Sequence, residues 1–339
     1  MKYAVVFNPD INILTCQFCW TKLLRYLSDQ PDYYSITKDD LYKGNFPSNK
    51  PPEIVLSFEN MKDIHEANIP EDVKIYIILD DLHHAYCNPN NIINSKKVYG
   101  IFTMYAYCYD IFYPKKQRVY LTPHAVTFTR DFNEKPIEKV LLSGRMNKSV
   151  YPFRQIVLEK SKKSKDIDRL VPNVSYRLNK RTNNEKSIYG QKYVDYLGKY
   201  LACFTCDLSE QRPYLVCKHF EIMASGSLLL AGNMHTKQIF EELGFIDMEH
   251  YVAVTIENFD EKVKYVLDPK NRELIDKIRR KGYELAKEKH TYLHRARFID
   301  SVIRGKENVE EKTYNVKRGN ITKKCYYLAE KIINVIECI

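Results

Sequence analysis

The sequence lacks the features that mark membrane-spanning and secreted proteins. No run approaches the roughly 20 apolar residues that a membrane-spanning helix needs. The first apolar run, residues 3–7, soon meets Pro9 and Asp10 and is too short for the core of a signal peptide. The nine cysteines are scattered and odd in number, which favours reduced thiols. We therefore expect a cytoplasmic protein.

Glycine is also scarce, with 11 residues in 339, and the glycine-rich nucleotide motifs are missing. A dinucleotide-binding enzyme carries G-x-G-x-x-G after its first strand, and a P-loop NTPase carries a Walker A sequence. This chain has FNPD after its first apolar run and no Walker A sequence anywhere. Oxidoreductase and NTPase functions are therefore unsupported.

Two kinds of short motif could bind a metal ion, but their neighbouring residues do not fit a metal site. Two C-x-x-C pairs begin at Cys16 and Cys203, but neither has the glycine-containing tight turn of a structural zinc site. The D-x-D string at Asp166 and Asp168 follows a run of lysines instead of an apolar strand. We interpret these strings as chance matches and expect no metal and no cofactor.

The composition describes a basic protein with enough apolar residues for a large core. Hydrophobic residues make up 44%, charged residues 28%, and the formal net charge is +10. This charge suits nucleic acid, a membrane surface or a small phosphorylated ligand. Basic residues such as Lys277, Arg279, Arg280 and Lys281 look spread along surface helices, and no RNP string or zinc finger occurs. We predict no specific nucleic-acid binding, and leave open peripheral contact with an anionic membrane.

Short apolar runs rich in Val, Ile and Tyr alternate with stretches of helical periodicity. The predicted strands are residues 3–7, 53–58, 74–79, 98–104, 139–143, 201–205, 227–231 and 251–255. Such alternation predicts an α/β fold with parallel sheets. We expect two Rossmann-like domains, residues 1–130 and 136–305, followed by a basic, partly helical tail, residues 306–339. Ligands of such sheets bind beyond the carboxyl ends of the strands, so the cleft between the domains is the expected site.

Helical periodicity is clearest in three places. Residues 15–28 carry apolar side chains at helical spacing, and residues 152–162 begin with Pro152, which suits the first turn of a helix. Residues 259–304 are nearly all helical, with breaks at 268–269 and near 289–291.

The most informative segment is residues 214–232, with the sequence YLVCKHFEIMASGSLLLAG. It predicts a helix that ends at Gly226, which can adopt the left-handed conformation, followed by a buried strand. At 100° per residue, Lys218, Glu221 and Ser225 share one face of this helix. Spacing alone fits a solvated face with a Lys–Glu pair worth a few tenths of a kcal/mol. It also fits a ligand-binding face.

The same segment resembles a family. FEIMASGSLLLAGN is similar to the E-A-M-A-C-G-x-P segment of two-domain (GT-B) glycosyltransferases of the GT4 kind, closest to the branch that includes the spore-maturation protein CgeB. The likeness continues through DPKNRELIDKIRRKGYELAKEKHTYLHRARFI, where that branch has a similar H-T-Y-x-H-R stretch, and back to LTPHAV and VLLSGRMNKSVYPFR. It covers roughly residues 120–300; the N-terminal third resembles the family only in pattern, apart from LDDLHH.

The resemblance implies a glycosyltransferase that moves a sugar from a nucleotide-sugar donor to an acceptor hydroxyl, with retention and without a metal. In the family, the glutamate matching Glu221 holds the ribose hydroxyls, and the loop with Gly144 and Arg145 meets the diphosphate. Lys148, Arg154 or Lys218 would supply a second cation. The full donor-binding set that we predict is Gly144, Arg145, Lys148, Arg154, Lys218, Glu221, Ser225 and Gly226.

This chain departs from the family's pattern at one position, and alternative functions therefore stay open. Many GT4 enzymes carry a second glutamate eight positions before the first, where this chain has Pro213. A catalytically weak carbohydrate-binding or assembly protein is therefore the alternative, and a nucleic-acid-binding protein comes third. The acceptor implied is a glycan, a lipid-linked sugar or a protein.

The N-terminal half offers the candidates for catalysis. In YIILDDLHHAY, Asp81 and His83 follow directly on the predicted strand 74–79, where a domain facing the cleft places ligand-contacting groups. An ordinary loop with solvated acids fits equally well. His124, in TPHAV, has a similar claim, although it could be a hinge residue packed against the sheet. The predicted catalytic set is Asp81, His83 and His124.

Overall fold

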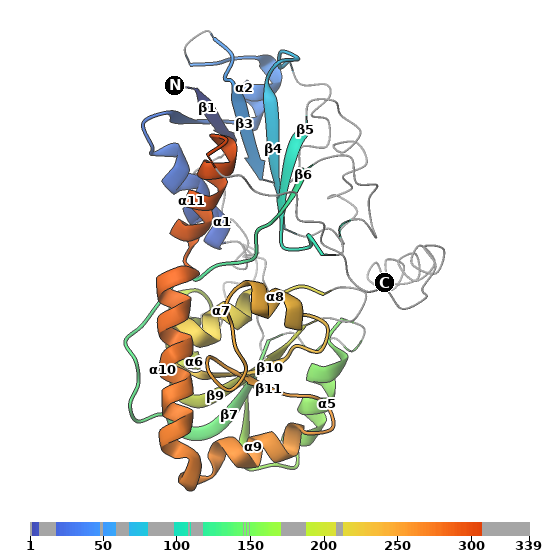
Figure 1. Cartoon of the computed structure of the whole chain (residues 1–339), viewed down its shortest axis with the longest axis vertical. Coiled ribbons are helices and arrows are strands. Elements are labelled where there is room, and N and C mark those ends of the chain that lie inside the picture. Colours follow the sequence, from blue (N-terminus) through green and yellow to red (C-terminus); the bar gives the residue numbers. More distant parts are fainter. Residues whose placement is uncertain are drawn as a thin grey trace, which may run out of the picture.

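The computed structural model describes residues 2–6, 18–47, 50–58, 68–80, 98–107, 109, 118–144, 146, 148, 150–170, 188–207 and 213–306. Its strands form two sheets, one in each half of the chain, with helices packed around them (Figure 1). The predicted α/β class with two Rossmann-like domains is confirmed. Within the described ranges, no helix combines the length and apolar character needed to cross a membrane.

The first sheet has the strand order β2-β1-β3-β4-β5-β6, and every neighbouring pair is parallel. Its strands are β1 (Tyr3–Val6), β2 (Tyr33–Ile36), β3 (Ile54–Phe58), β4 (Lys74–Leu79), β5 (Val98–Thr103) and β6 (Arg118–Leu121). Helix α1 (Phe18–Ser28) packs its apolar side into the core beside this sheet, and α2 (Lys38–Lys43) is a short helix capped by Thr37. The sequence did not predict β2 and β6, which are only four residues long.

The second sheet has the order β11-β10-β9-β7-β8 and is also parallel throughout. Its strands are β7 (Ile137–Ser143), β8 (Ile167–Leu170), β9 (Tyr200–Cys206), β10 (Leu228–Gly232) and β11 (Val252–Ala253). The unpredicted strand β8 lies at the edge and contains Asp168, which forms an ion pair with Lys139 at 2.7 Å. Asp168 therefore takes part in the framework of the sheet.

The helices in the second half of the chain follow the predicted pattern closely. They are α5 (Pro152–Ser161), α6 (Gln191–Leu197), α7 (Cys217–Ala224), α8 (Lys237–Glu242), α9 (Phe259–Leu267), the 3-10 turn η3 (Pro269–Asn271), α10 (Arg272–Lys289) and α11 (Tyr292–Ile303). Pro152 opens α5, and Gly226 follows α7 with a φ of 78°, both as predicted. The breaks before η3 and between α10 and α11 are also confirmed.

Helix α11 crosses back to the first sheet, where it lies beside α1 (Figure 1). The hydroxyl of Tyr33 donates to Asp300 at 2.7 Å, and Arg304 forms an ion pair with Asp32 at 2.8 Å. The predicted second domain, residues 136–305, thus includes a helix that packs against the first sheet. Helical periodicity predicts a helix but does not indicate which sheet the helix covers.

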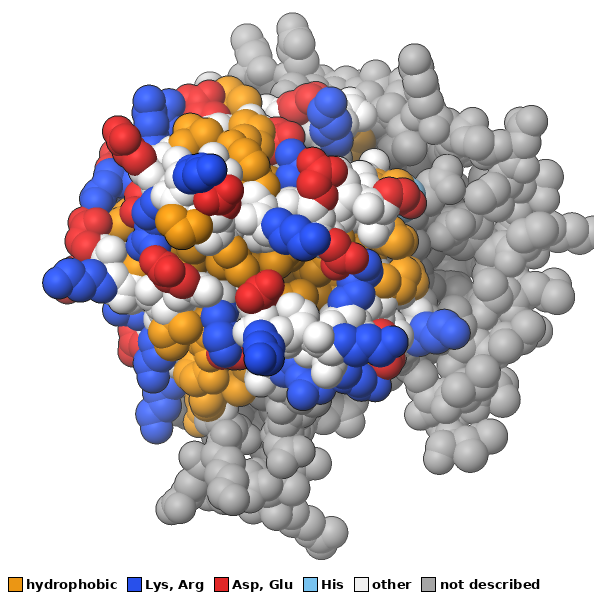
Figure 2. Space-filling model, turned by 90° about the horizontal axis from the view of Figure 1, so that it is seen from below, with side chains coloured by type: hydrophobic (Ala, Val, Ile, Leu, Met, Phe, Trp, Pro, Cys, Tyr) orange, Lys and Arg blue, Asp and Glu red, His pale blue; other side chains and the backbone are white. Residues whose placement is uncertain are grey.

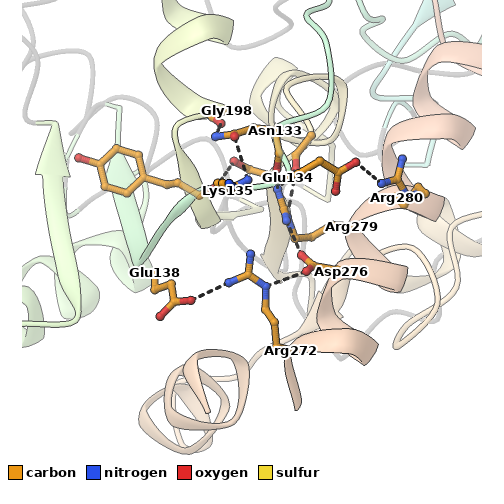
Figure 3. A network of polar contacts seen from close by, with 12 residues as sticks. Asn133, Glu134, Lys135, Glu138, Gly198, Arg272, Asp276, Arg279 and Arg280 are labelled. Atoms are coloured by element: carbon orange, nitrogen blue, oxygen red, sulfur yellow. Dashed lines mark hydrogen bonds and ion pairs between the residues drawn. The ribbon is translucent and has the colours of Figure 1, made fainter. Parts of the chain in front are cut away.

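The segment that leads into β7 is held on α10 by a polar network (Figure 3). Arg279 donates to the carbonyl oxygens of Gly226 and Asn133, and Arg280 forms an ion pair with Glu134 at 2.6 Å. Arg279 is only 1% exposed, so our expectation that it lies on the surface was wrong. Its guanidinium neutralises the carbonyl end of α7, where a cation is favourable.

The end of the molecule formed by the second domain shows basic and acidic side chains interspersed among apolar ones (Figure 2). Ion pairs explain part of this mixture, since Lys160 binds Asp260 and Arg272 binds Glu138. The described part of this face therefore does not gather the net positive charge into one patch.

Candidate functional site

A glycine forms the centre of the candidate site, at the carboxyl end of β7. Gly144 has a φ of +102°, a conformation that side chains rarely adopt. A Cβ atom here would lie 1.8 Å from Nζ of Lys218. Both the backbone conformation and the space therefore require glycine, and the chain can approach α7 only because the side chain is missing.

Lys218 lies in the first turn of α7 and turns its ammonium group toward that glycine. Its Nζ donates to the carbonyl oxygen of Ser143 at 2.7 Å, and the residue is 5% exposed. Burial, reinforced by the nearby charge of Arg154, lowers the pKa of Lys218 to about 7. No ion pair to Lys218 occurs within the described ranges. A buried cation without an acid partner is costly unless an anion joins it.

Arg154 brings a second buried cation to the same place. Its Nη2 donates to Oγ1 of Thr205, the residue before the end of β9, at 2.8 Å. Its guanidinium lies over the ring of Tyr151, 3.7 Å from the centroid, and the residue is 2% exposed. The guanidinium Nη1 would lie 3.6 Å from a Cβ on Gly144. The ends of β7 and β9 and the starts of α5 and α7 therefore meet around two cations.

The start of α7 adds the favourable end of a helix to these cations. The residue before it, Val216, provides no side-chain cap for the first backbone N–H groups. Uncapped N–H groups at the positive end of a helix dipole favour a bound anion. With the two cations, they make this corner of the domain suited to phosphate.

Glu221 lies one turn further along α7 and is half-buried. Burial raises the pKa of Glu221 to about 7, an effect that the charge of Lys218 opposes. Its carboxylate has no hydrogen bond or ion pair within the described part of the chain. The solvated Lys–Glu pair that spacing alone allowed is therefore wrong, because Lys218 is buried and does not form an ion pair with Glu221.

His219 is a buried polar residue that the sequence analysis did not select. Its Nδ1 lies 3.1 Å from the carbonyl oxygen of Val216, while Nε2 has no partner among the residues described. Burial lowers the pKa of His219 to about 3, and the charges of Arg154 and Lys218 add to this effect. The imidazole is therefore neutral beside the two cations.

The other predicted donor-binding residues divide into three groups. Lys148 is exposed in the loop before α5. Ser225 and Gly226 lie at the opposite end of α7, where the Ser225 hydroxyl donates to the carbonyl oxygen of Ile222 at 2.7 Å. These two residues end the helix and do not join the cation pair. Arg145 lies outside the described residues.

A second polar cluster lies at the carboxyl end of β4 in the first domain. The indole N–H of Trp20 donates to Oδ1 of Asp80 at 2.7 Å, and Nε2 of His124 lies 3.6 Å from the same oxygen. The other imidazole nitrogen, Nδ1, lies 3.7 Å from Sγ of Cys19. All four residues are buried. The other two predicted catalytic residues, Asp81 and His83, lie outside the described residues.

His124 links this cluster to the second domain. Its carbonyl oxygen accepts from Nη2 of Arg295 at 3.4 Å, and the amide of Val126 donates to the carbonyl oxygen of His290 at 2.8 Å. The rings of Tyr105, after β5, and Tyr214, before α7, lie 4.4 Å apart, so the two domains also meet there.

Comparisons with known proteins agree with this geometry. Residues 154–301 match the model of a family described as glycosyl transferase-like. No curated protein matches the chain. The sucrose-phosphate synthase from Thermosynechococcus elongatus superposes with a TM-score of 0.56 at 11% identity, covering 90% of this chain and 98% of that protein. An alpha-glucosyltransferase, in complex with UDP and a 13-mer DNA containing an HMU base, superposes with a TM-score of 0.58 at 12% identity. The match covers 90% of this chain and 99% of that protein.

TarM is a further structural neighbour, with a TM-score of 0.47 and 14% identity, and the chain spans 54% of its length. At these identities, structural likeness shows the fold alone. The fold is therefore the GT-B fold, and residues 154–301 match a glycosyl transferase-like family model.

Proposed function

We propose that the chain is a glycosyltransferase that holds a nucleoside-diphosphate sugar in its second domain and transfers the sugar to an acceptor hydroxyl in the cleft. The observation that carries this proposal is the meeting of Lys218 and Arg154 with the uncapped start of α7 around Gly144. The match over residues 154–301 supports the same general reaction.

Each group then has a task that its chemistry suits. Lys218 and Arg154 would offset the charge that grows on the diphosphate as it leaves, which is a main source of rate enhancement in such transfers. Glu221, whose carboxylate has no partner among the described residues, would accept from the two ribose hydroxyls in charge-assisted hydrogen bonds. Gly144 would let the backbone approach the phosphates.

The first domain would position the acceptor and the donor sugar. His124, held by Asp80, is the described member of the predicted catalytic set, and Asp81 and His83 remain predictions from the sequence. By analogy with the GT4 group we propose retention of the anomeric configuration, with a diphosphate oxygen helping to deprotonate the acceptor hydroxyl. No protein nucleophile is then required.

We also propose that transfer needs no metal ion, because the two cations and the helix end could offset the diphosphate charge. Activity should survive EDTA. A strict requirement for Mg²⁺ or Mn²⁺ would contradict this part of the proposal and would direct attention to Asp80 and its neighbour Asp81.

For the acceptor we propose only a class of molecule: a glycan, a lipid-linked sugar or a protein. The alpha-glucosyltransferase neighbour was solved with DNA, and the net charge of +10 suits an anionic acceptor, so DNA belongs among the acceptors to be tested. A catalytically weak carbohydrate-binding protein is the alternative function. It is favoured by Pro213, which is buried where many GT4 enzymes carry a glutamate.

The deciding experiment is calorimetry with UDP, GDP and ADP, followed by a test of the matching nucleotide sugars for release of nucleoside diphosphate. One nucleotide should bind, and its sugar should be turned over. Binding without turnover in the presence of any acceptor would favour the alternative function. If no nucleotide binds and no nucleotide sugar raises the melting temperature, the proposal is wrong.

A further inference from the structure

A buried arginine lies at the boundary between the two domains without an acid partner among the described residues. Arg295, on α11, is 8% exposed, and burial lowers its pKa to about 10. The guanidinium therefore stays charged at neutral pH. A charge that is removed from water without an opposite charge lowers the stability of a fold, unless strong hydrogen bonds compensate for it. The groups that Arg295 contacts indicate what it does.

All its hydrogen-bond partners belong to the connections between the domains. Its Nε donates to the carbonyl oxygen of Pro123 at 3.1 Å, and Nη2 donates to that of His124 at 3.4 Å. Nη2 also lies 3.1 Å from Nδ1 of His290. A guanidinium can only donate, so Nδ1 accepts and the imidazole proton is on Nε2. That nitrogen lies 3.0 Å from the carbonyl oxygen of Leu243 and donates to it.

The two chain segments that cross between the domains are paired at this point. The amide of Val126 donates to the carbonyl oxygen of His290 at 2.8 Å, and the amide of Tyr292 donates to that of Val126 at 3.1 Å. Arg295 thus lies beside the place where both crossings meet. His290 packs against Phe220 and Phe245 of the second domain, so the arginine is tied to both halves of the molecule.

We propose that Arg295 is a positioning residue that fixes the backbone of His124 and so holds its imidazole in register with the donor-binding helix α7. This inference rests on the proposed glycosyl transfer. The imidazole of His124 contacts Asp80 on one side and Cys19 on the other, and neither contact sets its position relative to α7. The hydrogen bonds of Arg295 and His290 do, because they connect the His124 carbonyl to the second domain.

A simple packing role would make different predictions. Methionine is similar in length to arginine and would fill the same space without the charge or the fork of donors. If Arg295 only packs, Arg295→Met should change stability alone. If it positions His124, the change should also reduce turnover, since a misplacement of about 1 Å at a reacting group can cost about 100-fold.

The experiment compares Arg295, within α11, with Arg304, the residue that follows the same helix. Arg304 forms ion pairs with Asp32 and Asp300. Arg295→Met should reduce kcat by about 100-fold with the affinity for UDP nearly unchanged, whereas Arg304→Met should lower the melting temperature and leave kcat as it is. Arg295→Lys keeps the charge but loses the planar fork of donors, so its kcat should lie between those of the parent and Arg295→Met. If the methionine variant does not fold, Arg295→Lys takes its place in the comparison.

A second measurement does not depend on transfer. The imidazole ¹⁵N signals of His124, assigned by their loss in His124→Gln, should shift or broaden in the Arg295 variant and stay unchanged in Arg304→Met. Equal kcat in the two methionine variants, or unmoved His124 signals in Arg295→Met or Arg295→Lys, would overturn the positioning role. If the parent protein transfers no sugar, the proposed function fails, and the His124 signals alone decide this inference.

Discussion

The carboxyl ends of the two sheets have the same geometry and opposite chemistry. In the second domain this end carries Lys218 and Arg154, two buried cations beside an uncapped helix start. In the first domain it carries Asp80, a buried carboxylate that accepts from Trp20 and lies beside His124. The same α/β architecture therefore places two buried cations in one domain and an acid–imidazole cluster in the other.

This difference indicates a division of tasks. The charged groups of a nucleotide sugar are its phosphates, so affinity should come from the second domain. The sugar and an acceptor hydroxyl are neutral, and groups that orient them or move a proton act on turnover more than on binding. Variants in the second domain should therefore change nucleotide affinity, and variants in the first domain should change turnover. Measuring both quantities tests whether the domains differ in this way.

The largest effect is expected at Gly144. In Gly144→Ala the new Cβ would collide with Nζ of Lys218, and a φ of +102° would be strained by roughly 1–3 kcal/mol. Displacing the ammonium would also remove the charged hydrogen bond to the phosphates that we propose. We expect UDP affinity, measured by calorimetry, to fall by about 100-fold or more.

Gly244 is the matched control for that variant. It also has a positive φ, +79°, but no atom lies within 4 Å of the position of its Cβ. Gly244→Ala should lower the melting temperature and leave UDP affinity unchanged. Equal affinities in the two alanine variants would mean that the nucleotide does not bind at Gly144.

On the other side of the cleft, His124→Gln should reduce turnover by about 100-fold, as loss of a positioning or proton-handling group commonly does. Nucleotide affinity should stay near that of the parent, because we propose that the phosphates bind to the other domain. Turnover can be followed as release of nucleoside diphosphate. Cys19→Ser changes the neighbour of the same imidazole and should have a much smaller effect; an equal loss in both variants would assign the cluster to packing.

Substitution of Glu221 should have a smaller effect on nucleotide affinity. Glu221→Ala should weaken nucleotide binding by about 1–3 kcal/mol, the free energy of hydrogen bonds to a charged group. The fold should be intact, since the carboxylate has no partner within the described ranges that the variant would leave unpaired. A nucleotide affinity equal to that of the parent would remove Glu221 from the site.

Much of the second domain could be predicted from the sequence, because its signals are local. The helix with Lys218 and Glu221, its end at Gly226 and the strand that follows all lie within about twenty residues of each other. The three strands that the sequence did not reveal, β2, β6 and β8, are four residues long, and each contains a polar residue: Ser35, Arg118 and Asp168. None of them therefore forms an apolar run like that of β1.

The contacts that define both clusters join distant parts of the chain, and no local pattern contains them. Lys218 reaches a carbonyl 75 residues earlier, and Trp20 donates to a carboxylate 60 residues later. The hydrogen bond from Arg295 to Pro123 spans 172 residues. The resemblance to a family indicated residue types for the donor side, but it did not indicate that Lys218 is buried. Burial depends on the fold as a whole, so the sequence did not select His219. Arg295 appeared only as the last residue of the H-T-Y-x-H-R stretch, without a role.

The smallest expected effect is on the proton balance of nucleotide binding. The folded pKa of Lys218, about 7, lies below its ordinary value of 10.5, so between these pH values the folded protein binds fewer protons there than the unfolded chain. The stability of the empty protein should therefore rise with pH through this window, and the cost of the buried charge is fully present below pH 7.

A diphosphate beside the ammonium favours the charged form and raises the pKa of Lys218 again. At pH 8 binding of UDP should take up between about 0.5 and 1 proton. Calorimetry in two buffers of different ionisation enthalpy measures this uptake. It should disappear in Lys218→Met and remain in Lys148→Met, whose lysine is exposed. Uptake that persists in Lys218→Met would mean that another group carries the proton and that Lys218 is not the cation beside the phosphates.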